Sequence, residues 1–273
     1  MADNVCASPS IKSIDFSSYK VHVVGNYNSC QKLLHELKQH CEDYPVLGFD
    51  CEWWSTCMTD PKGHRRKVAL LQLASAAGLC LLIQLTLLSD IPQELRDLLD
   101  DSRILKVGVE PLGDGSKLHH DYGLAVQGTV DLQTLAHHLD ISPPYGLKAL
   151  AKSVLGFEMV KKRQVALSNW EKPQLKARQI DYASKDAIVG LEIFRALNER
   201  IELREMDPFL DVCFKPPAVP TLEKQSSEPP QKKPRKRHPR SNLTPQMRPL
   251  PIKRLRVDPR QHQQLQGHLY TEF

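Results

Sequence analysis

Along the first 207 residues of this chain, apolar residues recur with two different spacings. Short apolar runs bounded by turn residues predict β-strands, and apolar residues three and four apart predict amphipathic helices. The predicted strands cover residues 19–26, 46–53, 67–75, 78–85, 103–109 and 129–132. The predicted helices cover residues 29–41, 91–101, 114–122, 133–139, 145–157 and 173–201. This order favours one α/β domain in which helices cover a sheet.

Beyond residue 207 the alternation stops and the composition changes. Residues 208–273 contain 12 of the 20 prolines and carry 13 Lys+Arg against 5 Asp+Glu, so the net charge of +5 comes from this part of the chain. Such a sequence buries too little apolar surface to offset the entropy lost on ordering. We therefore expect an N-terminal extension over residues 1–18, a domain over residues 19–207 and a disordered, Pro-rich, basic tail over residues 208–273.

Two basic clusters in the tail, residues 230–240 and 252–257, suggest where the protein acts. Such clusters are typical of nuclear-import signals and of arms that bind nucleic acid, and they also occur in solvated linkers. We expect a nuclear protein, with the cytoplasm and the mitochondrion as alternatives. No apolar run reaches the eighteen or so residues of a membrane span, and the N-terminus lacks a secretory signal, so we expect no transmembrane segment.

The cysteines and histidines argue against a disulfide framework and against zinc. The seven cysteines are odd in number and include no Cys-x-x-Cys pair, which indicates free thiols. Histidines occur as the adjacent pairs 119–120 and 137–138, and neighbours on a helix point in different directions. We therefore expect no zinc site.

The sequence VLGFDCEWW, residues 46–54, places two acidic residues in a strand that is otherwise suited to burial. Side chains alternate along a strand, so Asp50 and Glu52 project from one face and Cys51 from the other, where we expect it to pack as a small apolar residue. Neighbouring carboxylates repel each other and are costly to bury unpaired. The pattern indicates a bound cation, although a single Asp-x-Glu pair also occurs at ordinary strand ends.

Three further residues lie where they can meet this pair. Asp114 follows the strand 103–109, and the site of an α/β protein usually lies at the C-terminal edge of its sheet. Tyr182 and Asp186 stand four residues apart and share one face of the long helix. Each has an ordinary alternative: a helix N-cap for Asp114, and a half-buried aromatic and a surface charge for the other two. Together the carboxylates offer the oxygen ligands that Mg²⁺ prefers.

The motifs around these residues resemble those of the DEDD exonuclease superfamily. They are FDCEW, LLQLAS, LKVGVEPLGDGSKLHHDYGL, VDLQTLA, GLKALAKSVLG, SNW and YASKDA, in this order over about residues 19–203. The Tyr-x-x-x-Asp form of the last motif resembles the DEDDy branch, which includes ribonuclease D and the Werner-type exonuclease domain, and most closely the 3′–5′ exonuclease domain-containing protein 2 group. The resemblance implies an RNase H-like fold, a mixed five-stranded sheet flanked by helices.

The resemblance also implies an activity and assigns roles to residues. It implies a 3′→5′ exonuclease that uses two Mg²⁺ or Mn²⁺ ions to hydrolyse phosphodiester bonds of DNA or RNA at single-stranded or frayed 3′ ends, releasing nucleoside monophosphates. Asp50, Glu52 and Asp186 would hold the ion that carries the attacking water. The second ion would contact Asp50, with Asp114 acting through water. Tyr182 would keep its proton and orient the attacking water.

Contacts with nucleic acid are expected near the first motif. A basic loop over residues 55–66 follows it, and Lys and Arg side chains usually supply affinity for phosphates. Trp53 could stack on a terminal base, or it could pack in the core. The expected nucleic-acid contacts are Trp53, Lys62, Arg65, Arg66 and Lys67. A loop that is merely solvated remains the alternative for the basic residues.

One departure from the family pattern leaves a second function open. Glu110, followed by Pro111, stands where related proteins usually have Gly, and its carboxylate either perturbs the second motif or points outwards. The main alternative is a catalytically inactive exonuclease-like protein that binds nucleic acid or a protein partner. A phosphodiesterase or endonuclease is a further alternative. All five motif residues are present, which favours an active enzyme.

Overall fold

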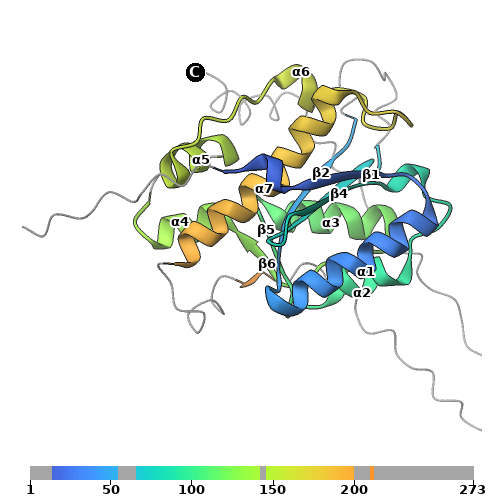
Figure 1. Cartoon of the computed structure of the whole chain (residues 1–273), viewed down its shortest axis with the longest axis horizontal. Coiled ribbons are helices and arrows are strands. Elements are labelled where there is room, and N and C mark those ends of the chain that lie inside the picture. Colours follow the sequence, from blue (N-terminus) through green and yellow to red (C-terminus); the bar gives the residue numbers. More distant parts are fainter. Residues whose placement is uncertain (1–13, 55–65, 142–145, 200–209, 212–273) are drawn as a thin grey trace, which may run out of the picture. The chain divides into compact units, whose positions relative to one another are not determined.

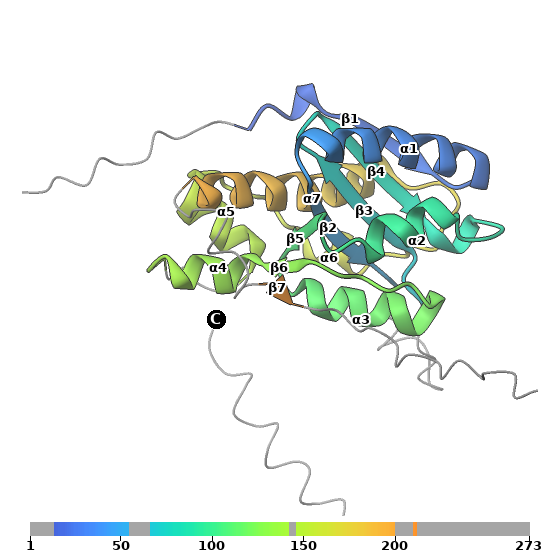
Figure 2. The same ribbon diagram turned by 90° about the horizontal axis from the view of Figure 1, so that it is seen from below.

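Seven strands form one mixed sheet within the residues that the computed structural model describes, 14–54, 66–141, 146–199 and 210–211. Their order across the sheet is β1-β4-β3-β2-β5-β6-β7 (Figures 1 and 2). The strands are β1 (Lys20–Val24), β2 (Val46–Glu52), β3 (Leu70–Ser75), β4 (Leu79–Gln84), β5 (Leu105–Gly108), β6 (Thr129–Asp131) and β7 (Leu210–Asp211). The expected α/β fold with a mixed sheet flanked by helices is confirmed.

The sheet has two strands more than the five that the resemblance implies and one strand, β7, more than the six that the apolar pattern predicts. Strand β2 lies at the centre, antiparallel to β3 and parallel to β5. Strand β1 pairs in parallel with β4 at one edge, and β7 pairs antiparallel with β6 at the other. A sheet edge presents unpaired N–H and C=O groups, so each edge can accept a further strand. These two pairings extend the sheet to seven strands.

The helices cover both faces of the sheet. They are α1 (Tyr27–Asp43), α2 (Gln93–Asp100), α3 (Pro111–Tyr122), α4 (Leu132–His138), α5 (Leu147–Leu155), α6 (Arg163–Ala166) and α7 (Ala177–Asn198), with short 3₁₀ turns at Phe16–Ser18 and Leu85–Leu87. Helices α1, α2 and α3 pack in one apolar cluster and helices α4 to α7 in a second one. No helix in the described ranges has both the length and the apolar character needed to cross a bilayer.

The alternation of side chains in β2 divides its residues between these two clusters. Leu47, Phe49 and Cys51 are buried with α1, α2 and α3, so Cys51 packs as the small apolar residue that its position predicts. Val46 belongs to the cluster on the α7 face. Since side chains in a strand point alternately to opposite faces, Asp50 shares the α7 face with Val46.

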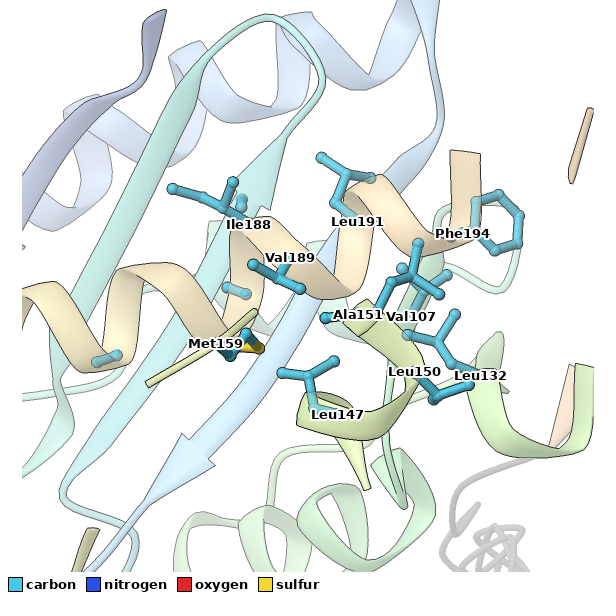
Figure 3. Packing of buried hydrophobic residues seen from close by; sticks show 14 of the residues in the cluster. Val107, Leu132, Leu147, Leu150, Ala151, Met159, Ile188, Val189, Leu191 and Phe194 are labelled. Carbon is cyan, nitrogen blue, oxygen red and sulfur yellow. The ribbon is translucent and has the colours of Figure 1, made fainter. Parts of the chain in front are cut away.

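Helix α7 crosses the centre of the sheet at a very short distance. A Cβ atom at Gly48 of β2 would lie 2.0 Å from the carbonyl oxygen of Ala187, so only glycine allows this approach. Apolar side chains of α7 fill the space beside the crossing, and Figure 3 shows Val189 and Leu191 on α7 and Leu147 on α5 as members of one cluster. The crossing is therefore fixed by backbone contact at one point and by side-chain packing around it.

Helix α3 begins earlier than the sequence predicts. It starts at Pro111 rather than Asp114, because proline suits the first position of a helix, where no N–H bond is lost. Glu110 is the N-cap residue and has left-handed backbone angles, φ 55° and ψ 40°. Its side chain is exposed, so it points outwards, as one of the two expectations held. Asp114 consequently lies in the first turn of the helix and is not its cap.

Several expectations fall on residues outside the described ranges. They are the phosphate contacts Lys62 and Arg65 and nearly all of the tail, with its basic clusters at 230–240 and 252–257. Leu210 and Asp211 of the tail are described, and the prediction of disorder is wrong for them, because they form strand β7. Of the N-terminal extension, residues 14–18 are described, and Ile14 and Phe16 pack against the apolar cluster of α7. The ring of Phe16 lies 5.4 Å from that of Phe157, between centroids.

The crossing at Gly48 gives a stability prediction. Replacing Gly48 with Ala forces a methyl group against the Ala187 carbonyl, so we expect the free energy of unfolding to fall by about 1–3 kcal/mol. Gly113→Ala is the matched control, because a Cβ at Gly113 meets no atom within 4 Å and alanine favours a helix by about 0.5–1 kcal/mol. Urea denaturation measures both variants. Equal stability of Gly48→Ala and the wild type would contradict the tight crossing.

Candidate active site

Three carboxylates from two elements converge beside the crossing of α7 and β2. Oxygen atoms of Asp50, Glu52 and Asp186 all lie within 4.8 Å of one another. Asp186 immediately precedes Ala187, the residue whose carbonyl oxygen faces Gly48. The close crossing of α7 and β2 therefore places the Asp186 side chain next to the strand. Within the described ranges, this is the only group of three or more Asp, Glu, His or Cys residues close enough to hold one metal ion.

Asp114 lies next to this group but is not part of it. Helix α3 follows β5, which is parallel to β2, so its first turn comes to the edge of the sheet where Asp50 lies. Burial raises the pKa of Asp114, and the negative charges of Asp50 and Glu110 raise it further. Of the four expected metal ligands, three are brought together and Asp114 lies alongside Asp50.

The buried environment makes the negative charges of the cluster costly. Loss of water is the largest cause that raises the pKa values of Asp50, Glu52 and Asp186 above their ordinary range. Repulsion between the carboxylates adds to the shift of Asp50 and Glu52. The positive charge of Lys161 acts in the opposite direction on all three. A cation within the cluster therefore stabilises its ionised form.

Lys161 is the cation that the fold supplies. Its Nζ atom lies 2.8 Å from Oδ2 of Asp186 and 5.3 Å from the centre of the Tyr182 ring. Sequence reasoning missed this residue, because Lys161, Lys162 and Arg163 form a run of basic residues that resembles an ordinary solvated surface. Only the position of this segment beside α7 distinguishes Lys161 from its neighbours.

Tyr182 stands one helical turn before Asp186, as its spacing predicts, and its side chain is hydrogen-bonded to Asp186. Burial and the nearby negative charge of Asp186 raise the pKa of Tyr182 above its ordinary value. The phenol thus keeps its proton at neutral pH and remains a hydrogen-bond donor. The ring centre lies 6.1 Å from that of the fully buried Trp170, which restricts its position.

Three of the residues expected to contact nucleic acid, Trp53, Arg66 and Lys67, are described by the structure, and they lie at the end of β2 and beside α3. Trp53 is 37% exposed, which excludes the alternative that it packs in the core. The Nζ atom of Lys117, a residue that sequence reasoning missed, lies 5.0 Å from the centre of the Trp53 ring. Arg66 lies 5.0 Å from the centre of the Trp54 ring, and Lys67 lies over Tyr122 of α3. Basic and aromatic side chains therefore gather next to the carboxylates.

Gln72 is a second residue that sequence reasoning missed. It pairs with Asp50 across β2 and β3 and is completely buried. Neither its Oε1 nor its Nε2 atom has a hydrogen-bond partner among the described protein atoms. The sequence did contain a signal for Gln72, because it is the one amide in the largely apolar stretch LLQLAS. A buried amide without a protein partner is unusual, and this one lies beside Asp50, a candidate metal ligand.

Known proteins with a similar sequence were compared with this chain. The family model described as a 3′–5′ exonuclease matches residues 26–202. Exonuclease 3′–5′ domain-containing protein 2 of Drosophila melanogaster is 42% identical over 202 residues, which cover 67% of this chain and 33% of that protein. The human protein of the same name is 40% identical over 165 residues, which cover 58% of this chain and 26% of that protein.

A more distant relative and a solved structure are also similar to this chain. The mouse bifunctional 3′–5′ exonuclease/ATP-dependent helicase WRN is 31% identical over 200 residues, which cover 71% of this chain and 14% of that protein. The EXD2 exonuclease domain soaked in Mn is 36% identical, with 68% of this chain and 93% of that chain covered and a TM-score of 0.41. The chain spans a third or less of the length of the curated relatives named here. Because the family model matches more than half of it, this chain belongs to the 3′–5′ exonuclease family.

Proposed function

We propose that this domain hydrolyses phosphodiester bonds one nucleotide at a time from the 3′ end of DNA or RNA, releasing nucleoside monophosphates. The observation that carries the proposal is the convergence of Asp50, Glu52 and Asp186 in a member of a 3′–5′ exonuclease family. The same reaction serves both nucleic acids, because the phosphodiester is common to them. The substrates we propose are single-stranded or frayed 3′ ends.

The carboxylate cluster suits divalent cations. Its ligands are oxygen atoms that lie within 4.8 Å of one another, and hard cations such as Mg²⁺ and Mn²⁺ prefer such ligands. We propose that Asp50, Glu52 and Asp186 hold one ion and that Asp50 and Asp114 face a second one. When bound, two such ions lower the pKa of a bound water towards ~7 and neutralise charge on the attacking and leaving oxygens.

The chain's own side chains would orient the reactants. Tyr182 keeps its proton, so its hydroxyl can donate a hydrogen bond at the cluster but cannot act as a general base at neutral pH. Its hydrogen bond to Asp186 and its contact with Trp170 fix where this donor points. Asp50 and Glu52 are half-buried and Asp186 is buried, so the cluster contacts less water than a surface site and electrostatic interactions there are stronger. No covalent intermediate with the enzyme is required.

The surface at the end of β2 is the proposed path of the substrate strand. The exposed Trp53 offers a ring on which a base can stack, and such stacking contributes about 1–3 kcal/mol per base. Lys67, Arg66 and Lys117 lie close by, although Arg66 is paired with Glu171 and Lys117 with Asp121. We propose that these basic side chains meet backbone phosphates of the substrate. Lys62 and Arg65 belong to the same basic segment and are proposed as further contacts. The basic clusters at 230–240 and 252–257 support a nuclear location.

A double substitution at the metal site tests the activity. Asp50→Asn with Glu52→Gln keeps the shape of both side chains and removes their charges. We expect the rate at which a 5′-labelled single-stranded oligonucleotide is shortened from its 3′ end to fall at least about 100-fold. The reason is that the carboxylate charges hold the ions that would stabilise the transition state. Reactions with Mg²⁺, with Mn²⁺ and with EDTA, on DNA and on RNA, show the metal requirement and the preferred sugar.

The matched control is the double variant Glu42→Gln with Asp43→Asn at the exposed end of α1, which we expect to cut like the wild type. The metal-free site variant should melt no lower than the wild type, because two repelling buried carboxylates have been neutralised. A 3′-phosphorylated oligonucleotide should resist the wild type, whereas an endonuclease would cut it. Binding of the oligonucleotide without shortening in either metal would favour the inactive alternative.

Glu110 gives a separate test of that alternative. The residue is exposed and adds to the pKa rise of Asp114, which is itself outside the three-carboxylate group. We therefore expect Glu110→Gly to change the rate of shortening by less than about tenfold, which corresponds to less than ~1.4 kcal/mol. A much larger gain would show that Glu110 suppresses the activity of the natural chain.

A further inference from the structure

Lys161 occupies the position at Asp186 that a divalent cation would need. It lies in the segment between α5 and α6, and its Nζ atom is 2.8 Å from Asp186 Oδ2. The Asp186 side chain is only 3% exposed, so few directions remain from which a cation can approach it. The Lys161 side chain is 29% exposed and therefore has space to move on its solvent side.

The ammonium group and a metal ion cannot both sit against the same carboxylate without strong repulsion. Asp50, Glu52 and Asp186 have oxygen atoms within 4.8 Å of one another, so an ion bound to them would lie close to the present position of the Lys161 ammonium. The repulsion grows with the charge of the ion and is weakly screened at a buried site. Lys161 must then leave Asp186 when the ion binds, and its charge needs a new anionic partner.

A pocket next to Lys161 can receive such a partner. It has a volume of about 280 Å³ and lies between residues 157–165 and the first half of α7. Its wall includes the positive side chains of Lys161, Lys162, Arg178 and Lys185, and it reaches Asp186. Lys185 is paired with Asp181 at 2.7 Å, whereas Lys162 and Arg178 are exposed. The wall also includes Glu158, Asp181 and Asp186, so four basic side chains stand against three acidic ones and the cavity keeps one net positive charge. A metal ion on Asp186 would free Lys161, and its ammonium could then pair with a phosphate group in this cavity.

We propose that Lys161 is an exchangeable counter-ion of the metal site, which neutralises Asp186 without metal and pairs with a nucleotide phosphate once divalent cations hold the carboxylate. The second half of this inference rests on the proposed function; the first half does not. In the metal-free protein the Lys161 ammonium pairs directly with the Asp186 carboxylate, at 2.8 Å from Oδ2. With metal and substrate bound, the same charge contributes to holding the phosphate.

The variant Lys161→Met tests both halves, since it keeps a side chain of similar length without the charge. Calorimetric titration of the full chain with Mn²⁺ should show about three- to tenfold tighter binding, because the competing cation is gone. Binding of adenosine 5′-monophosphate in saturating Mn²⁺ should weaken about tenfold, because one charge-assisted contact with phosphate is lost. The value of kcat/KM on a single-stranded oligonucleotide should fall by a similar factor.

The matched control is Lys162→Met, which changes the same pocket next to the same backbone but removes an exposed side chain. We expect its Mn²⁺ affinity to stay within about twofold of the wild type, because exposed charges at a distance are screened. A Lys161 that merely anchors its segment would give weaker or unchanged Mn²⁺ binding in Lys161→Met, and this result would overturn the inference. Tighter Mn²⁺ binding with unchanged nucleotide binding would overturn the phosphate half.

Two measurements that do not depend on cutting keep this inference separate from the proposed function. A wild-type chain that never shortens an oligonucleotide would refute the proposed function. Mn²⁺ titration of Lys161→Met would still decide the counter-ion role, and the titration with adenosine 5′-monophosphate would still decide the phosphate contact.

Discussion

The contact between the Ala187 carbonyl and Gly48 is the constraint on which the site depends. A Cβ atom at residue 48 would lie 2.0 Å from that oxygen, so the absence of a side chain sets how close α7 comes to β2. Asp186 is the neighbour of Ala187, and Asp50 lies two residues after Gly48 on the same face of the strand. A wider crossing would separate these carboxylates and leave no group of oxygens for one ion.

This geometry creates an electrostatic conflict that the fold only partly resolves. Burial raises the pKa values of Asp50, Glu52 and Asp186, because charged carboxylates lose their water. Lys161 compensates at Asp186, where its ammonium lies 2.8 Å from Oδ2. The apolar residues of α5 and α7 hold the elements in place against the remaining repulsion. Under the proposed function, a divalent cation would take the place of Lys161 and neutralise the three carboxylates together.

Local patterns in the sequence predicted the parts of this site that depend on one element. Alternation along β2 gave the shared face of Asp50 and Glu52, and helical spacing gave that of Tyr182 and Asp186. The sequence contains no local pattern that shows which distant segments come into contact, and the ion pair between Lys161 and Asp186 was therefore not predicted. Lys106 shows the same limit: in sequence it is a polar residue in a strand, yet it is fully buried, and its Nζ atom donates to the carbonyl oxygens of Asp101 and Ile104. Six of the seven strands were predicted; β7 was missed because it is two residues long and lies in a segment whose composition predicts disorder.

A crystal structure of the full chain grown with Mn²⁺ tests the central claim most directly, because anomalous scattering locates manganese without assumptions about activity. The account predicts a manganese peak bonded to oxygen atoms of Asp50, Glu52 and Asp186, with the Lys161 ammonium moved away from Asp186. Manganese bound elsewhere, or a carboxylate cluster without a peak and with Lys161 still paired to Asp186 at saturating Mn²⁺, would contradict the claim that the crossing of α7 over β2 builds a metal centre.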